Sequence, residues 1–338
     1  MDAGLEAFGE TSRFEQLSKL LPVSAVIATV CILYFGYFYL HCLRLFQSDL
    51  PPEKQNSEML ARGYWQTVTF HVVTTLLSYC LLRCIFTSPG TVPDGQGWEL
   101  KPDEEGAEGN EHEGGPHLVE KKHTGERRHC KWCLKYKPDR THHCRVCNLC
   151  VLKMDHHCPW IYNCVGFRNH KFFFLLLVYA LLDLSLVSIT MFDTVWWSTR
   201  VDVSIVTMIS LLFGETLAMF LLVLIIAFLS FHVWLMTKAM TTVEFCEKSL
   251  KKASYNSSIY SRGFYGNVCA VLGPQPLLWF LPLSFPEGDG LTWPPSKESQ
   301  GRQSLLQKRG SRVSFSSATG DEAQTSRSSR KKGTSRST

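Results

Sequence analysis

The segment 130–164 reads CKWCLKYKPDRTHHCRVCNLCVLKMDHHCPWIYNC, and its spacing of cysteine and histidine decides what fold to expect. It holds seven of the chain's thirteen cysteines. A Cys-x2-Cys pair presents two thiolates from one tight turn to the same ion, and a second pair completes the tetrahedron. Two such pairs, three further cysteines and two His-His pairs therefore predict bound zinc. The cysteines are Cys130, Cys133, Cys144, Cys147, Cys150, Cys158 and Cys164, and the histidine pairs lie at 142–143 and 156–157.

The segment contains one cysteine more than two zinc ions need. Two closed Cys₃His sites take six cysteines and two histidines, so one of the seven thiols has no structural task. Spacing alone does not say whether this spare thiol is Cys150, Cys158 or Cys164. Cys158 is the natural candidate, because His156 lies two residues before it and Asp155 precedes that histidine. A thiolate nucleophile needs a base within reach and a carboxylate that orients the base.

Four apolar segments flank the Cys-rich segment, and each is long enough to cross a membrane. A hydrocarbon core of ~30 Å takes ~20 helical residues. The apolar segments cover about 20–40, 68–86, 172–192 and 203–236. A buried core helix would explain one such segment, but not four in one chain. The sequence therefore predicts a mainly α-helical membrane protein with four transmembrane helices. A Cys-rich zinc domain of short β-hairpins is expected between the second and third helices.

Basic residues are unevenly distributed around the four spans and indicate the orientation. The loop 87–171 carries thirteen Lys and Arg residues, whereas 47–66 holds only Lys54 and Arg62 and the last loop holds only Arg200. Basic loops stay on the cytosolic side of a membrane. We therefore expect both termini and the Cys-rich domain in the cytosol, where thiolates stay reduced. The endoplasmic reticulum, the Golgi and the plasma membrane would all suit such a protein.

The two most polar stretches of the chain are expected to lack a fixed fold. The tail 301–338 holds nine Lys/Arg against two acidic residues, a charge of +7, which leaves −2 for the rest of a chain with net charge +5. Such a basic, Ser-rich tail is typical of disorder and either contacts anionic lipid or keeps the end soluble. The Gly/Glu-rich stretch 103–115 predicts a flexible linker. The expected divisions are a cytosolic N-terminus (1–19), two spans (20–86), a linker (87–129), the Cys-rich domain (130–171), two spans (172–236), a C-terminal domain (237–290) and a disordered tail (291–338).

The segment 130–174 resembles the Cys-rich domain of DHHC-type palmitoyltransferases, with every expected cysteine and histidine in place. Outside it, TTVE at 241–244 resembles the family's TTxE motif. NVCAVLG at 267–273 resembles its Asn-x3-Val-Phe-Gly element with leucine in place of the aromatic residue. SPG at 88–90 stands where the family often has Asp-Pro-Gly, and 281–290 looks similar to the animal subgroup with broad substrates.

This resemblance implies a protein S-acyltransferase. The enzyme would move a fatty acyl group from acyl-CoA to cysteines of substrate proteins at the cytosolic face, through an acyl intermediate on Cys158. His156 would be the general base or acid, and Asp155 would orient it. Thr242 would hydrogen-bond near Asp155, and Asn267 would brace the helix ends under the site.

The resemblance also implies two structural zinc ions and a set of CoA contacts. One ion is assigned to Cys130, Cys133, His143 and Cys150, and the other to Cys144, Cys147, His157 and Cys164. Basic side chains are the expected partners of CoA phosphates, although each could equally be an ordinary solvated charge. The candidates are Lys135, Lys137, Arg140 and Arg168.

A catalytically silent, zinc-containing membrane adaptor is the alternative function. A scaffold, however, has no need of an intact Asp-His-His-Cys sequence. Nucleic acid is not an expected partner, because the Cys-rich domain adjoins two membrane spans and lacks C₂H₂ spacing. The expected partners are fatty acyl-CoA, cytosolic-face proteins with accessible cysteines, and membrane lipid.

Several ionisable residues fall inside the predicted spans. His41 and Arg83 are expected near cytosolic ends, with side chains that reach the interface. Asp183 lies about eleven residues into the third span, ~17 Å deep. If its carboxylate faces the cavity for the fatty tail, it would be protonated or paired with His71 or Glu215 and would disfavour longer tails. Alternatively, it packs against another helix through a hydrogen bond.

Overall fold

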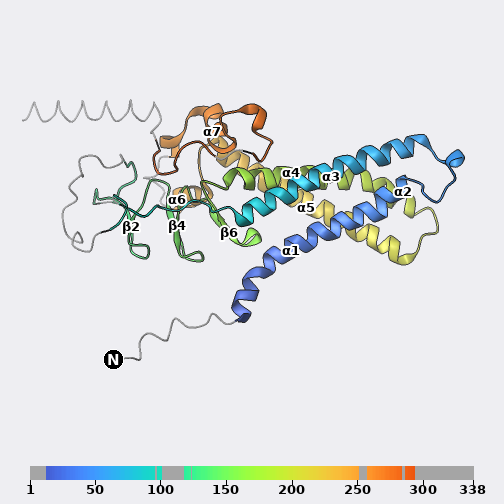
Figure 1. The fold of residues 1–338 in the computed structure, drawn as a ribbon, viewed down its shortest axis with the longest axis horizontal. Helices are drawn as coiled ribbons and strands as arrows, with labels where there is room; N and C mark the ends of the chain where they lie inside the picture. Colours follow the sequence, from blue (N-terminus) through green and yellow to red (C-terminus); the bar gives the residue numbers. More distant parts are fainter. Residues whose placement is uncertain are drawn as a thin grey trace, which may run out of the picture.

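The computed structural model describes residues 13–95, 97–100, 118–122, 124–250, 257–283 and 286–293 of the 338-residue chain. Figure 1 shows long helices that run side by side along the longest axis, with short hairpins gathered at one end. The predicted linker 103–115 and the predicted tail 301–338 lie outside the described residues.

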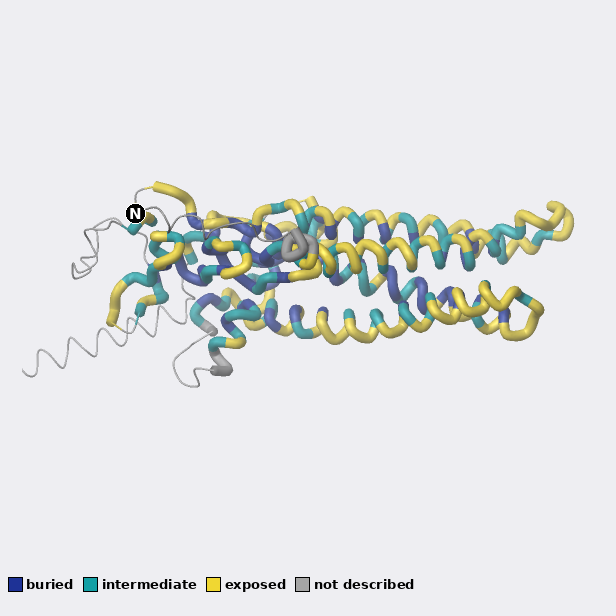
Figure 2. The backbone as a smooth tube through the Cα atoms, turned by 90° about the horizontal axis from the view of Figure 1, so that it is seen from below, coloured by how far each residue is buried: buried dark blue, intermediate teal, exposed yellow. Residues whose placement is uncertain are grey.

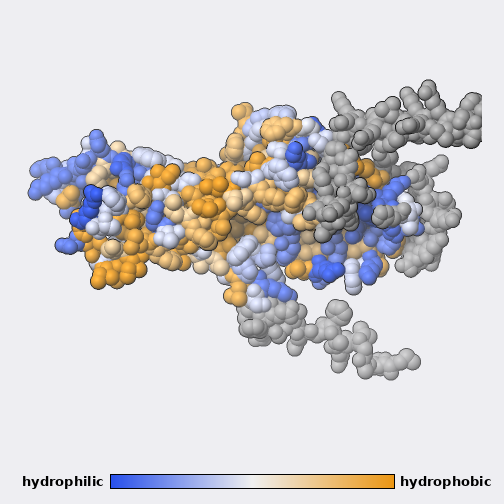
Figure 3. Space-filling view, turned by 180° about the vertical axis from the view of Figure 1, so that it is seen from behind, coloured by the Kyte–Doolittle hydropathy of each residue, from blue (hydrophilic) through white to orange (hydrophobic). Residues whose placement is uncertain are grey.

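Four helices of the described chain are long and apolar enough to cross a membrane. The first span, Ser18–Leu45, is formed by α1 (Arg13–Tyr37), the π-helical turn η2 (Phe38–Cys42) and α2 (Leu43–Leu45). The other three are α3 (Ser57–Phe86), α4 (His170–Ser198) and α5 (Ile205–Thr237). Figure 3 shows apolar residues along this bundle and more hydrophilic residues towards its ends. The chain is therefore a multi-pass membrane protein, as its sequence predicted.

The helix that carries the second predicted span begins well before that span. Asn56 caps α3, since its side-chain oxygen accepts hydrogen bonds from the backbone N–H groups of Glu58 (2.9 Å) and Met59 (3.2 Å). Residues 57–66 were expected in the loop 47–66, and this expectation is wrong. Hydropathy marks the length of helix that lipid covers, whereas the cap determines where the helix begins.

Helix α4 is the central element of the bundle. It packs against both α3 and α5, and 56% of its most apolar stretch is buried, against 6% for α1. Figure 2 shows that buried residues are most concentrated where the bundle meets the hairpins. The best-packed part of the molecule is therefore the junction between the membrane helices and the Cys-rich domain.

Three antiparallel hairpins form the Cys-rich domain between α3 and α4, as predicted. They pair β1 (His129–Cys130) with β2 (Lys135–Tyr136), β3 (His142–Cys144) with β4 (Leu149–Val151), and β5 (His156–Cys158) with β6 (Asn163–Val165). The C-terminal part contributes α6 (Thr242–Leu250), η6 (Ser257–Tyr260), α7 (Gly263–Leu272) and η7 (Pro276–Leu278), and short 3₁₀ turns occur at η3 (Pro52–Lys54) and η5 (Pro159–Ile161).

The expectation for His41 is wrong. This residue follows α1 at the end of the bundle away from the hairpins (Figure 1), and its side chain is 0% exposed. Its Nδ1 lies 2.7 Å from Thr194 Oγ1, and its Nε2 lies 2.9 Å from Gln66 Oε1. The imidazole therefore joins three helices through buried hydrogen bonds. Arg83 does lie at the hairpin end, 4.5 Å above the Phe172 ring.

Candidate active site and metal centres

The hairpins bring together two groups of side chains that could each hold a metal ion. Within each group all the ligand atoms lie within 4.8 Å of one another. The first group is Cys130, Cys133, His143 and Cys150, and the second is Cys144, Cys147, His157 and Cys164. These are the two four-residue sets expected from the sequence, and none of the cysteines is in a disulfide.

Distances within the second group suit a tetrahedral zinc ion. Zn–S bonds of ~2.3 Å and Zn–N bonds of ~2.0 Å imply tetrahedron edges of about 3.5–3.8 Å. His157 Nδ1 lies 3.7, 3.3 and 3.6 Å from the Sγ atoms of Cys144, Cys147 and Cys164. Three sulfur atoms and one imidazole nitrogen form a closed set with no position for a water ligand. A zinc ion held there would brace the hairpins and would not itself activate a substrate.

The hairpins are copies of one unit that recurs every 14 residues. HHCRVCNLCV at 142–151 aligns with HHCPWIYNCV at 156–165, and the two copies pair their strands in the same register. The turn residue has a positive φ in every copy, at Leu134 (50°), Asn148 (53°) and Tyr162 (48°). The Cys-x2-Cys pair of one copy shares its metal group with a histidine and a cysteine of the next copy.

This repeat explains which cysteine is spare. The third hairpin has no following copy to complete a metal group, and Ile161 stands where the second cysteine of a pair would be. Cys158 is therefore the thiol that the repeat leaves outside both groups, whereas Cys150 and Cys164 each lie inside one. The 14-residue period is present in the sequence, although counting ligands does not reveal it.

A histidine and a carboxylate stand beside this spare thiol. His156 and Cys158 are two residues apart in β5, so their side chains leave the same face of the strand. His156 Nδ1 lies 2.7 Å from Asp155 Oδ2. The carboxylate also accepts hydrogen bonds from Thr242, at 3.0 Å from its backbone N–H and 2.8 Å from its Oγ1. The expected contact of Thr242 is therefore confirmed, and Nε2 is the imidazole nitrogen left for the thiol.

Electrostatics favour the charged forms of both groups. Burial lowers the pKa of His156, but the hydrogen bonds to Asp155 and Cys158 raise it by more. The resulting pKa is about 9, above the usual value for histidine. Burial would raise the pKa of Asp155, but the hydrogen bond from His156 and nearby histidine charges hold it well below its usual range. At neutral pH the pair is therefore an imidazolium beside a carboxylate. A neighbouring imidazolium stabilises a cysteine thiolate.

The third hairpin is docked onto the ends of the membrane helices. Cys158 is 6% exposed and packs in one apolar cluster with residues of α3, α4, α5 and α7. Asn163, which pairs with Cys158 across the hairpin, donates hydrogen bonds to the carbonyl groups of Cys84 (3.0 Å) and Thr87 (2.9 Å). Asn267 Nδ2 likewise donates to Thr237 O at the end of α5 (2.9 Å), as expected. The thiol therefore lies where the chain leaves the membrane.

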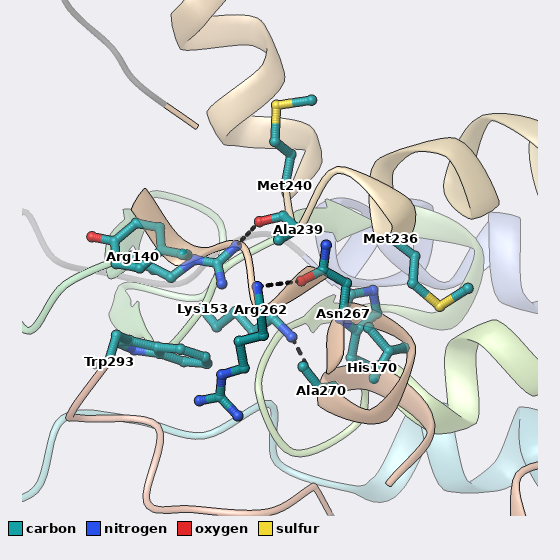
Figure 4. Close-up of a pocket in the computed structure, with 12 residues that line it drawn as sticks. Arg140, Lys153, His170, Met236, Ala239, Met240, Arg262, Asn267, Ala270 and Trp293 are labelled. Atoms are coloured by element: carbon teal, nitrogen blue, oxygen red, sulfur yellow. Dashed lines mark hydrogen bonds between the residues drawn. The ribbon is translucent and has the colours of Figure 1, made fainter. Parts of the chain in front are cut away.

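Arg140 does not stand free for a CoA phosphate, and the expectation for this residue is wrong. Its side chain is 4% exposed and forms a two-point ion pair with Glu244, at 2.6 and 2.8 Å. A further bond of 2.9 Å runs to the carbonyl oxygen of Ala239, towards which the guanidinium points in Figure 4. The ion pair ties the Cys-rich domain to α6, and nothing in the local sequence around either partner indicated it.

This ion pair leads to a prediction about stability. We expect Glu244→Ala to lower the free energy of unfolding by about 3–5 kcal/mol, because it leaves the buried charge of Arg140 uncompensated. Thermal unfolding of the purified protein measures the loss. Glu247→Ala on the same helix removes an acidic side chain that is 34% exposed and should change stability by less than about 1 kcal/mol. Equal losses for both variants would contradict a special role for the buried pair.

The other three candidate CoA contacts have different surroundings. Lys135 Nζ lies 2.6 Å from Asp94 Oδ1 and 3.0 Å from the carbonyl oxygen of Val92, so its charge is already engaged. Lys137 is half-buried on the hairpin farthest from the helices, and Arg168 is exposed just before α4. Arg168 remains the candidate nearest in sequence to the helix ends that surround Cys158.

Asp183 is paired, but not with the residues expected. Its Oδ1 accepts a hydrogen bond of 3.0 Å from Thr74 Oγ1, which joins α4 to α3. His71 instead contacts Tyr34 OH at 3.1 Å, and Glu215 Oε2 has no partner among the described residues. The predicted pairing with His71 or Glu215 is therefore wrong, and the contact is the hydrogen bond to another helix that the alternative expected. Thr74 also lines a groove of about 330 Å³ between α1 and α3, and Asp183 lies behind it through this hydrogen bond.

Comparison with known proteins was made on the whole chain. A family model described as DHHC palmitoyltransferase matches residues 123–249. The chain is 32% identical to the zebrafish (Danio rerio) palmitoyltransferase ZDHHC15A over 310 residues, which is 84% of this chain and 87% of that protein. It is 30% identical to zebrafish ZDHHC20-B over 81% of this chain and 82% of that protein. The rat (Rattus norvegicus) palmitoyltransferase ZDHHC2 is 39% identical over a shorter region, 51% of this chain and 47% of that protein.

Proposed function

The chain belongs to the DHHC palmitoyltransferase family and is a protein S-palmitoyltransferase, and we propose that Cys158 is the residue that carries the acyl group. One observation carries the proposal: Cys158 is the cysteine of the hairpin repeat outside both metal groups, and it adjoins the Asp155–His156 pair. This arrangement supports acyl transfer in two steps.

In the first step the Cys158 thiolate attacks the carbonyl carbon of a fatty acyl-CoA thioester. A new C–S bond forms, the bond to the CoA sulfur breaks, and the imidazolium of His156 gives its proton to the departing thiolate. Asp155 keeps the imidazole oriented, and Thr242 fixes Asp155 through two hydrogen bonds. The products are acyl-Cys158 and free CoA.

In the second step a cysteine of a substrate protein attacks the acyl-enzyme. Neutral His156 takes the proton of the incoming thiol, the acyl group moves to the substrate sulfur, and the Cys158 thiolate is released. The position of Cys158 at the ends of the helices supports this reaction, because the acyl chain can enter the bilayer while CoA and the substrate protein stay in water.

The proposal also includes zinc binding by the hairpins, the contacts to CoA and the orientation of the chain in the membrane. Each Cys₃His group would hold one zinc ion that braces the hairpins, and the distances within the second group support this. Arg168 and Lys137 would bind the phosphates of CoA, whereas Lys135 would first have to leave its ion pair with Asp94. Both termini would face the cytosol, in an endomembrane or the plasma membrane, which the basic loop 87–171 supports.

Labelling tests the proposed activity directly. We expect the purified protein in detergent to take up label from an acyl-CoA analogue, and hydroxylamine at neutral pH to remove it, since a thioester is cleaved under these conditions. Transfer of the label to a cysteine peptide would complete the cycle. A well-folded sample that takes up no label would favour the silent adaptor instead.

The Asp155–His156 pair is expected to control the rate without affecting the metal groups. Asp155→Asn removes the charge that orients His156, and we expect acyl-enzyme formation to slow by about 10²–10⁴-fold. Thr242→Val removes one of three hydrogen bonds to this carboxylate and should give a smaller loss, about 10-fold. Rapid-quench labelling gives both rates, and metal analysis should find unchanged metal content. Metal loss in Asp155→Asn would contradict a purely catalytic role.

We propose that the Asp183–Thr74 pair limits the length of the acyl chain. A tail that reached this depth would meet a carboxylate, and an ionisable group is costly against methylene groups. We expect Asp183→Ala to shift the preference towards acyl-CoAs longer than palmitoyl-CoA, as measured by competition labelling with chains of graded length. Asp193→Ala is the control, because it removes an exposed carboxylate from the same helix. An unchanged profile in a stable, active Asp183→Ala enzyme would leave Asp183 only a packing role.

A further inference from the structure

A small cavity lies between the end of α5 and helix α7 (Figure 4). Its volume is about 20 Å³, and basic side chains from three separate segments line it: Arg140, Lys153 and Arg262. His170, the first residue of α4, closes another side. Arg140 is neutralised by Glu244, so the other groups determine the charge of the cavity.

Lys153 is a buried basic group with no carboxylate in direct contact among the described residues. Its side chain is 5% exposed, and among the described residues no carboxylate forms an ion pair with it. Its ammonium has a long contact of 3.4 Å to the carbonyl oxygen of Ala270 and lies 5.6 Å from the Trp293 ring. Burial and the charge of Arg140 lower the pKa of Lys153 to about 7, although the more distant carboxylates of Glu244 and Asp155 act in the opposite direction. An isolated buried ammonium is costly, so a negative group in the cavity would stabilise it.

A second group in the cavity lacks a hydrogen-bond partner among the described residues. His170 is 8% exposed, and its Nδ1 is buried without a hydrogen bond among the described residues. Buried polar atoms are nearly always satisfied, and an exception points to a bound water or ion. Arg262 is exposed, and in Figure 4 its guanidinium extends away from Lys153 and the other buried groups. The cavity therefore contains a buried lysine with a single long hydrogen bond and an imidazole nitrogen without one, and it has an exposed cation at its edge.

The position of the cavity indicates what kind of anion would reach it. His170 begins the third span, and Met236, which also lines the cavity, is the second-last residue of the fourth. The cavity therefore lies at the boundary of the bilayer on the side of the Cys-rich domain. Phospholipid phosphates lie at this level. A volume of about 20 Å³ admits one water molecule or one oxygen atom of a larger group, but not a whole phosphate.

We propose that this cavity is a phosphate-binding site for an anionic phospholipid headgroup. One phosphate oxygen would enter against Lys153 and His170, and the remaining oxygens would stay outside with Arg262. Lys153 precedes Asp155 by two residues, so an occupied site would also hold the backbone that positions the catalytic carboxylate. The binding does not depend on the proposed acyl-transfer mechanism and is measured separately from it.

The test compares bound lipid in wild-type protein and three variants. The full chain is placed in nanodiscs of phosphatidylcholine with phosphatidic acid, extracted into detergent, and analysed by native mass spectrometry. We expect Arg262→Gln and Lys153→Met to retain at least about 10-fold less phosphatidic acid than the wild type, since each loses a charge-assisted hydrogen bond. Lys238→Gln is the matched control, because Lys238 is exposed at the same membrane level but does not line the cavity.

Further measurements distinguish a lipid phosphate from a soluble phosphate compound, and loss of binding from loss of folding. Inorganic phosphate that displaces the lipid at millimolar concentration would support the phosphate site but assign it to a soluble phosphate compound. Because Arg262 is exposed, Arg262→Gln should keep the wild-type melting temperature, so its result is decisive even if Lys153→Met unfolds. Equal retention of phosphatidic acid by Arg262→Gln and wild type, or no retention by the wild type, would overturn the proposal and leave a bound water molecule in the cavity.

Discussion

We expect Cys158→Ser to abolish the acyl-enzyme and transfer to substrate, while the protein keeps its metal content and its melting temperature. Cys158 lies outside both metal groups, so the replacement removes no metal ligand. A serine hydroxyl beside His156 stays protonated at neutral pH and is a far weaker nucleophile than a thiolate. Labelling with an acyl-CoA analogue, elemental analysis and thermal unfolding on one sample test the three parts of this expectation.

The control for this variant is another cysteine of the same chain. Cys246 is exposed on α6 and belongs to neither metal group, so Cys246→Ser should label like the wild type. Loss of metal from Cys158→Ser would show that the spare thiol had been chosen wrongly. Labelling of Cys158→Ser at the wild-type level would show that another residue carries the acyl group.

Loss of a metal ligand is expected to unfold part of the Cys-rich domain. Cys130→Ser and Cys164→Ser should each reduce the zinc content from two ions per chain to one. Zinc binding contributes about 10–16 kcal/mol to the folding of small zinc peptides, so the hairpins that share the ion should open. Elemental analysis measures the zinc, and limited proteolysis of the purified protein shows the opened segment.

The two ligand variants should differ in their effect on catalysis. Cys164 pairs with His157 across the third hairpin, next to Cys158, so Cys164→Ser should abolish labelling. Cys130 belongs to the first hairpin, two copies of the repeat away, so Cys130→Ser should keep more residual labelling. A folded, active wild-type protein with one zinc ion or none would contradict the two-ion assignment, and Cys246→Ser should keep both ions.

The sequence alone was sufficient for the presence of four membrane spans and of bound metal, whereas the division of the ligands into two groups came from the family resemblance. A transmembrane span is recognised from composition over some twenty residues, and a metal knuckle from cysteines three residues apart. Both signals are local, so neither depends on how distant segments pack. The choice of Cys158 was local as well, because Asp155 and His156 are its neighbours in the chain. The 14-residue hairpin repeat strengthens this choice, and it too can be read from the sequence.

Contacts between distant segments could be decided only by the tertiary structure. Arg140 was expected to bind a CoA phosphate because it is basic, yet it forms an ion pair with Glu244, 104 residues away. His41 looked like an interfacial residue, yet it is buried between helices. Asp183 accepts a hydrogen bond from Thr74 on a neighbouring helix, 109 residues away. The charge of a basic or acidic side chain is known from the sequence. Its partner, however, depends on which helices pack together and how they are rotated. The sequence therefore determined which reactive and metal-binding groups the protein contains. Tertiary packing determined which charged side chains are paired with one another and which remain available to bind a ligand.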